Sequence, residues 1–311
     1  MSFVEPSNSV DIQLNSVLLA NDFSPASAKA LPHALAVARH YGAKVYLAHV
    51  VSALGLTLAG PDALSEAADL AMRDSRQLQQ TLVANGALNG LRHEVIVREG
   101  DIPEELGKAI EREKVDVVVL GTHSRRGLEK LLLGSVAEQI FRQASCLVLT
   151  VGPSSPDSPP IEKPAGLGPM LFATDFSRTS LFALPYAISF ANRHKTKLVL
   201  LNVIPEVPLS STFGWHTPED VARLQKADRE TALQKLRDLV STAHLLSRPE
   251  FVVESGEPTD VILRTAKKIG VDTIVLGLNR ASSLGIGSHA PWGTAYAVVC
   301  GASCPVLTVR S

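Results

Sequence analysis

The stretch SVLLANDFSPAS (16–27) occurs a second time, slightly altered, as PMLFATDFSRTS (169–180). Four further segments repeat in the same order, at offsets of about 153 to 158 residues. A repeat of this length is a whole domain, which indicates gene duplication rather than a solenoid of short units. The other matching pairs are 43–51 with 196–204, 97–106 with 253–262, 115–121 with 271–277, and 145–151 with 303–309.

The segment between the copies, GPSSPDSPPIEKPAGLGP (152–169), is dense in proline, glycine and serine and has no apolar periodicity. Linkers of this composition extend toward polyproline geometry and act as semi-rigid spacers. We therefore expect a first domain over residues 1–151, a linker over 152–168 and a second domain over 169–311.

Within each copy, continuous apolar runs alternate with amphipathic segments. In the first copy the run at 17–20 is followed by Ser24-Pro25, which signals a helix start, and Gly42 signals the end of that helix. Strands that are apolar along their whole length are typical of a parallel sheet with helices on both faces. Right-handed crossovers then favour a doubly wound α/β domain, which binds ligands at the carboxyl ends of its strands.

Composition and charge narrow the class of protein. The 311 residues are 45% hydrophobic and 20% charged, as in well-cored globular proteins. A net charge of −1 provides no basic field, so we expect no nucleic-acid or membrane partner. The chain starts without a signal-peptide pattern, and no apolar run approaches the roughly 20 residues that span a bilayer. These observations predict a cytoplasmic location.

A loop rich in glycine, serine and basic residues follows the run at 115–121. Its Gly121, Ser124, Gly134 and Ser135 resemble the Gly-x2-Gly-x9-Gly-Ser/Thr motif of the universal stress protein family, with serine in place of the second glycine. The resemblance extends over both copies. It implies two tandem domains, each a five-stranded parallel sheet of order 3-2-1-4-5. In the nucleotide-binding branch of the family it also implies ATP at this loop, with or without Mg²⁺.

The residue types of this loop suit a phosphate on physical grounds as well. Glycine lets backbone N–H groups approach an anion closely, and Arg125 adds positive charge. Gly134-Ser135 begins a predicted helix, whose free N–H groups and dipole favour negative charge. The alternative is that Ser135 and Glu138 form a capping box and nothing more. A side chain at Ser124 crowds the loop, so we predict a weakened or retuned phosphate site.

The nucleoside side of the site is predicted at the carboxyl ends of the first two strands. Asp22 follows the first strand, where an open α/β sheet has its ligand crevice. By resemblance, Asp22 faces the ribose, and the backbone of Ala20 and Val50 holds the adenine. The alternative for Asp22 is a turn-forming residue without a ligand.

The second copy keeps the nucleoside side but not the loop. Its first glycine and a Gly-Thr pair survive, whereas Arg280 replaces the second glycine and the spacing is longer. Pro291 and Trp292 are expected before the helix. We interpret this site as degraded, or as reshaped for another ligand. Its residues are Asp175, Val203, Gly277, Arg280, Gly293 and Thr294.

Several classes of function remain open. The favoured one is a nucleotide-dependent stress or regulatory module that binds ATP through its N-terminal domain. The second is a nucleotide-independent scaffold or interaction protein, and a less favoured third is a slow ATPase or adenylyl-transferring enzyme. No recognisable catalytic motif supports an enzyme. His49 has Asn202 as its counterpart, which predicts a hydrogen-bonding role rather than a catalytic base.

The last strand of each copy, at 146–151 and 304–309, is rich in valine and leucine and ends its domain at a sheet edge. Such an edge invites pairing with another strand. We expect the copies to pair through these strands as a pseudo-twofold dimer within one chain, and a homodimer of the whole chain stays open. Cys146, Cys300 and Cys304 do not suggest a disulfide framework, and Cys300 and Cys304 are expected to be core residues rather than a zinc site.

Overall fold

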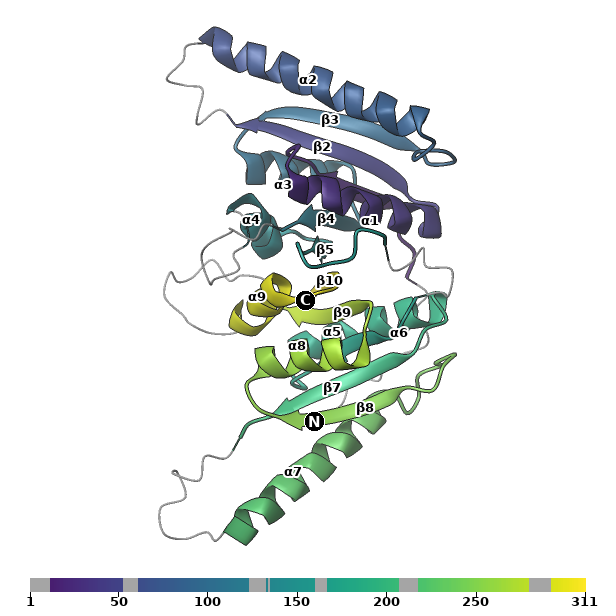
Figure 1. The fold of residues 1–311 in the computed structure, drawn as a ribbon, viewed down its shortest axis with the longest axis vertical. Coiled ribbons are helices and arrows are strands. Elements are labelled where there is room, and N and C mark those ends of the chain that lie inside the picture. The colour runs from purple at the N-terminus through teal and green to yellow at the C-terminus, as the bar shows by residue number, and fades with distance from the viewer. Residues whose placement is uncertain are drawn as a thin grey trace.

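A computed structural model describes residues 12–52, 61–122, 133, 135–159, 167–206, 218–279 and 292–311. Strands and helices alternate along each half, except that two consecutive helices follow the first strand of the C-terminal half (Figure 1). The strands are β1 (Ser16–Ala20), β2 (Lys44–Ser52), β3 (His93–Gly100), β4 (Val117–Gly121), β5 (Leu147–Val151), β6 (Met170–Ala173), β7 (Leu198–Ile204), β8 (Glu250–Ser255), β9 (Thr273–Leu278) and β10 (Val306–Arg310). The helices are α1 (Pro25–Tyr41), α2 (Pro61–Ala84), α3 (Ile102–Arg112), α4 (Ser135–Gln143), α5 (Arg178–Phe182), α6 (Leu184–Arg193), α7 (Pro218–Leu239), α8 (Pro258–Ile269) and α9 (Trp292–Gly301).

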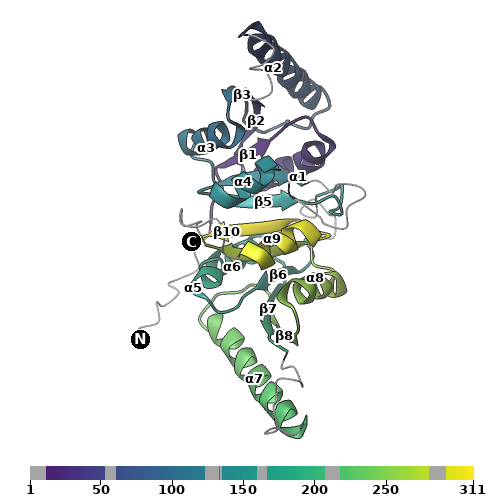
Figure 2. The ribbon, with the colours of Figure 1, turned by 90° about the vertical axis from the view of Figure 1, so that its left-hand side faces the viewer.

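All the strands belong to one ten-stranded sheet of order β3-β2-β1-β4-β5-β10-β9-β6-β7-β8. Each half therefore has the expected order 3-2-1-4-5, and its strands are parallel. The halves meet where β10 pairs antiparallel with β5, with Leu307 opposite Leu149. The two five-stranded sheets are thus continuous, and Figure 2 shows β5 and β10 side by side at the centre of the molecule.

Alternation along the strands divides the core into two layers. Leu18 and Ala20 belong to the layer that α3, α4, α8 and α9 cover, whereas Val17 and Leu19 belong to the layer that α1, α2, α6 and α7 cover. Both layers run through the N-terminal and the C-terminal half without a break, because β5 and β10 contribute side chains to each. The doubly wound α/β fold with helices on both faces is confirmed.

The segment that was expected to be an extended linker packs against α1. Ser155 is buried and its Oγ accepts a hydrogen bond from Gly152 N at 3.1 Å. Lys29 donates to Pro153 O at 2.8 Å, and His33 Nε2 lies 3.0 Å from Pro156 O. Residues 152–159 therefore turn back onto the first domain, because their backbone carbonyls find donors on α1.

An apolar cavity of about 80 Å³ lies between the halves, on the face that α1 and α6 cover. Leu14, Val37 and Phe190 are among the residues that line it. Beside it, the ring of His40 at the end of α1 stacks on that of His194, with centroids 4.0 Å apart, and the Arg193 guanidinium lies over the Tyr41 ring. Burial, His40 and Arg193 together lower the pKa of His194 to about 3.

This cluster predicts that acid weakens the junction of the two halves. In the unfolded chain His194 has an ordinary pKa near 6.5, so the unfolded state binds more protons between pH 6.5 and pH 3. The contribution of neutral His194 to the free energy of unfolding is therefore fully present above this pH window and is lost as the pH falls through it. Going from pH 7 to pH 5 should cost about 2 kcal/mol through His194 alone. Burial and the Arg193 charge also lower the pKa of His40, so His40 adds to the loss of stability at low pH.

Urea unfolding of the wild type and of His194→Gln at both pH values measures this effect. The glutamine variant should lose about 2 kcal/mol less on acidification, since the variant has no proton to gain at this position. Equal losses in the two proteins would contradict the prediction.

Among the described residues, none of the helices combines the length and the apolar composition that crossing a bilayer requires. Cys146, Cys300 and Cys304 are free thiols. Cys300 and Cys304 are buried, as expected of core residues.

Candidate nucleotide site

Three residues expected on the nucleoside and phosphate sides lie at one edge of the sheet. Ala20 ends β1, Val50 lies near the end of β2, and Gly121 ends β4. Because β1 pairs with both β2 and β4, these strand ends are neighbours. Ala20 and Val50 also pack in the same core layer, on the face of α3 and α4. This edge is the topological switch point of the N-terminal half.

Asp22 forms the turn after β1. Its Oδ1 accepts a hydrogen bond from Ser24 N at 3.0 Å, and Asn21 Oδ1 accepts one from Phe23 N at 3.1 Å. These turns hold Phe23 at a φ of 59°, a left-handed conformation that is unfavourable for an aromatic residue. Asp22 thus has the turn-forming role that was its alternative reading. Its side chain is also exposed at the edge where the strands end.

The second copy has the same turn. Asp175 Oδ1 accepts a hydrogen bond from Ser177 N at 2.9 Å, and Phe176 has a φ of 62°. Burial opposes ionisation of Asp175, but hydrogen bonds from Ser177 and Ser180 outweigh it and hold its pKa below the ordinary value. A strained backbone at the same position in both copies marks this turn as a candidate functional element.

A polar side chain from the second strand of each half supports this turn. His49 Nδ1 lies 2.7 Å from Asn21 O, and Asn202 Nδ2 donates to Thr174 O at 2.8 Å. The His49 ring also contacts that of Phe23, with centroids 4.9 Å apart. The hydrogen-bonding role expected of His49 and Asn202 is confirmed.

The close packing of β4 against α1 requires glycine at position 121. A Cβ atom there would overlap the Ala26 carbonyl and lie 2.9 Å from Ser27 N, in the first turn of α1. At Gly277 in the second copy, a Cβ would lie 2.7 Å from Ser180 Cα. Neither glycine has a positive φ, so the requirement is steric. The first glycine of the motif therefore has a packing role in both copies, whether or not a ligand binds.

Most of the predicted phosphate loop lies outside the described residues, including Ser124, Arg125 and Gly134. α4 begins at Ser135, as expected, and the side chain of Ser135 is likewise outside the description. Glu138, the glutamate of the alternative capping box, forms an ion pair with Arg142 at 2.7 Å, one turn further along α4.

The corresponding edge of the C-terminal half keeps the strand-end positions of the first copy. Val203 on β7 occupies the position of Val50, and Arg280 lies outside the described residues. Thr179 on α5 donates a hydrogen bond to Asn279 Oδ1, which ties the helix to the end of β9. The expected site residues Val203 and Asp175 are thus in place, whereas the loop between β9 and α9 is not described.

The start of α9 differs from expectation. Trp292 is the first residue of the helix rather than a residue before it, so Gly293 and Thr294 lie inside the first turn. Pro291 explains the shift, because a helix readily begins at or just after a proline. In the first copy the matching Gly134-Ser135 pair straddles the helix start, since α4 begins at Ser135.

Comparison with known proteins decides the family. The family model described as the universal stress protein family matches residues 14–152 and, a second time, residues 167–310. The chain belongs to the universal stress protein family. Each match spans one copy of the duplicated unit.

Individual universal stress proteins resemble one copy or the whole chain. One from Methanocaldococcus jannaschii is 30% identical over 143 residues, which are 43% of this chain and 80% of that protein. YxiE of Bacillus subtilis is 26% identical over 44% of this chain and 98% of its own length. The crystal structure of one from Archaeoglobus fulgidus is 22% identical, with a TM-score of 0.70 over 96% of this chain and 99% of that one. The last shares the fold of both halves together.

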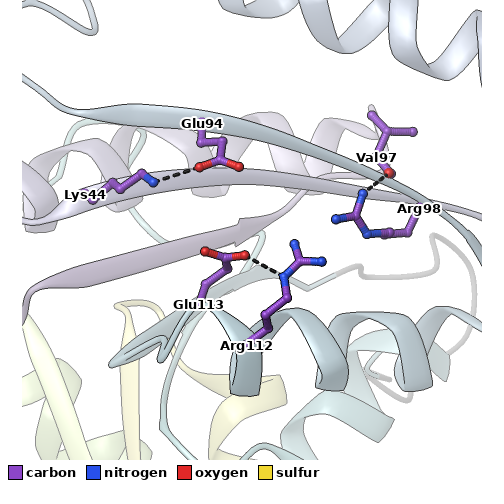
Figure 3. Close-up of polar contacts among 6 residues, drawn as sticks. All are labelled: Lys44, Glu94, Val97, Arg98, Arg112 and Glu113. Atoms are coloured by element: carbon purple, nitrogen blue, oxygen red, sulfur yellow. Dashed lines mark hydrogen bonds and ion pairs between the residues drawn. The ribbon is translucent and has the colours of Figure 1, made fainter.

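In this universal stress protein a charged crevice of about 510 Å³ lies between β3 and α3. Arg98 lines it and is the register partner of Val50. Figure 3 shows the pairing of the surrounding charges: Lys44 with Glu94 at 2.7 Å, and Arg112 with Glu113 at 2.7 Å.

Arg98 Nη1 donates a hydrogen bond to the neighbouring Val97 O at 2.9 Å (Figure 3). Arg98 was not among the predicted site residues, although its two-residue spacing from the buried Ile96 places both on the same face of β3. Lys108 is paired with Glu105 and Arg112 with Glu113, and Glu111 lines the crevice as Arg98 does. Three acidic groups thus balance its three basic groups, which leaves no surplus of positive charge for an anion.

Within the described parts of the chain, His, Cys, Asp and Glu side chains form no group of three or more that could hold a metal ion.

Proposed function

We propose that this universal stress protein is a nucleotide-dependent regulatory module that binds ATP at the switch point of its N-terminal half. The observation that carries the proposal is the placement of Ala20, Val50 and the start of α4 on one face of the sheet, at adjacent strand ends. An adenine needs an apolar strand-end surface, and a phosphate needs a helix N-terminus. This edge offers both.

The phosphate would lie at the N-terminus of α4. The four N–H groups of the first turn have no partner within a helix, and the dipole adds a partial positive charge there. Gly134 and Ser135 would let the backbone N–H groups come close to the phosphate, and Arg125 would add a positive charge from the loop. Asp22, exposed at the end of β1, suits a ribose hydroxyl. Mg²⁺, if required, would be held mainly by the phosphates.

The C-terminal half is proposed to bind ATP weakly or not at all. Its helix begins at Trp292, so Gly293 and Thr294 are the second and third residues of that helix, whereas Ser135 is the first residue of α4. We propose that this half serves as the intrachain partner of the N-terminal half through β5 and β10, in a cytoplasmic protein. The alternative is a nucleotide-independent scaffold, and the experiment below separates the two.

Titration calorimetry with ATP and Mg²⁺ tests the site. The wild type should bind about one ATP per chain. Ser135→Trp places a bulky side chain at the first residue of α4 and should weaken binding at least about tenfold, since the indole occupies the phosphate position. Repeating the titration with EDTA shows whether Mg²⁺ contributes.

Thr294→Trp is the matched control, because Thr294 follows the glycine of the second copy as Ser135 follows that of the first. It should bind ATP like the wild type. Equal affinity of Ser135→Trp and wild type would remove the N-terminal loop as the site. No binding by any of the three proteins would favour the scaffold.

A further inference from the structure

A tyrosine of the C-terminal half reaches the loop of the N-terminal half. Tyr296, on α9, accepts a hydrogen bond through its hydroxyl from Leu133 N at 3.3 Å. Leu133 is buried and lies two residues before α4 begins at Ser135. The contact therefore joins the second copy to the backbone that leads into the proposed phosphate position.

Packing fixes the tyrosine ring in this place. Phe141 of α4 is completely buried, and its ring meets that of Tyr296 edge-on, with centroids 6.4 Å apart and planes at 69°. Burial and the neighbouring Cys300 raise the pKa of Tyr296, so the hydroxyl stays protonated and neutral at physiological pH. A neutral hydroxyl still accepts the bond from the Leu133 amide. Figures 1 and 2 both show α4 and α9 as neighbours across the junction of the halves.

The other end of α4 is also held by the C-terminal half. Arg310, the last residue of β10, donates hydrogen bonds to Phe141 O and Arg142 O. These carbonyls belong to the last turn of α4, where a cation also complements the helix dipole. A helix of nine residues is thus fastened to the other copy at both of its ends.

The Tyr296 contact has no symmetric counterpart. The pairing of 145–151 with 303–309, continued back along the two helices, puts Glu138 at the position of Tyr296 and Val299 at the position of Phe141. Each copy therefore has an aromatic side chain where the other has none. Pro291 stands at the position of Leu133 and has no N–H group, so an equivalent hydrogen bond to the loop of the C-terminal copy does not exist.

We propose that Tyr296 is a positioning residue that the C-terminal copy contributes to the nucleotide site of the N-terminal copy. By holding Leu133, it sets where α4 begins and where its first N–H groups point. This inference rests on the proposed ATP site. It gives the C-terminal copy, whose own loop departs from the motif, a direct part in nucleotide affinity.

The substitution Tyr296→Phe removes the hydroxyl and keeps the ring against Phe141. In the full-length protein without nucleotide, hydrogen exchange of the Leu133 amide should become about tenfold faster, because it loses its hydrogen-bond acceptor. The affinity for ATP and Mg²⁺ should fall about five- to tenfold. The melting temperature should stay close to that of the wild type, since the packing is unchanged.

Tyr186→Phe is the matched control, because Tyr186 lies on α6, away from α4, and contacts Phe182. It should change neither exchange at Leu133 nor ATP affinity. Unchanged Leu133 exchange in Tyr296→Phe overturns the inference whatever happens to ATP. Faster exchange with unchanged ATP affinity also overturns it but leaves the proposed function standing. A wild type that takes up no ATP defeats the proposed function and this inference together.

Discussion

Gly121→Ala is expected to lower the free energy of unfolding by about 3 kcal/mol, because the added Cβ overlaps the Ala26 carbonyl in the first turn of α1. The clash is with backbone atoms, which cannot rotate away as the end of a side chain can. Relief requires α1 to move off β4, and α1 supplies Ala30 and Ala34 to the core layer on that face. Urea unfolding of the protein without nucleotide measures the effect.

Gly107→Ala is the control with the same chemical change and the opposite expected sign. Gly107 lies within α3, and a Cβ there would meet no atom within 4 Å. Alanine in place of a helical glycine should raise stability by about 0.5 to 1 kcal/mol. If Gly121→Ala left stability unchanged and impaired only ATP binding, Gly121 would serve the ligand and not the packing.

Phe141→Ala is expected to cost about 3 to 5 kcal/mol, in the range for large aromatic side chains truncated in a core. Phe141 is 0% exposed and fills the space between α4 and Tyr296. Removing it leaves a cavity at the junction of the halves, and the cores on either side of the junction belong to one continuous layer. Chemical denaturation followed by circular dichroism gives the size of the loss.

Phe182→Ala provides the comparison, since Phe182 is 46% exposed on α5. Its truncation should change stability by no more than about 0.5 kcal/mol. A loss at Phe141 as small as that at Phe182 would mean that the two halves close the cavity by repacking, and that their junction is softer than the buried contacts indicate.

The fold was predictable because its signals are local and occur twice. Apolar runs such as 17–20 and 115–121 define buried strands, and caps such as Ser24 and Gly42 define helix ends. Because the pattern occurs twice, a strand or helix predicted in one copy can be compared with the matching segment of the other. One difference is that the helix after β6 breaks at Ala183 into α5 and α6, whereas α1 continues through Pro32. Pro185 stands where Pro32 does, so proline alone does not decide the break.

The candidate site was only partly predictable. Ala20, Val50 and Gly121 could be placed together because neighbouring parallel strands end at one edge. The steric role of Gly121 depends on how closely α1 approaches β4, which a sequence does not encode locally. The contact between Leu133 and Tyr296 joins residues 163 positions apart. Leu133 is one of the variable positions of the loop motif, and Tyr296 lies in no recognisable motif, so neither residue type signals the contact.

The antiparallel pair β5–β10 has a consequence for how the two halves can change over time. In a homodimer with twofold symmetry, every substitution near the axis appears on both sides of the interface at once. In this chain the same axis relates two different gene segments, so a substitution appears on one side only. Tyr296 facing Phe141 is a contact that a symmetric dimer could not form from these positions. Because the two halves are covalently joined, each half can change its side of the interface independently while its partner stays in place.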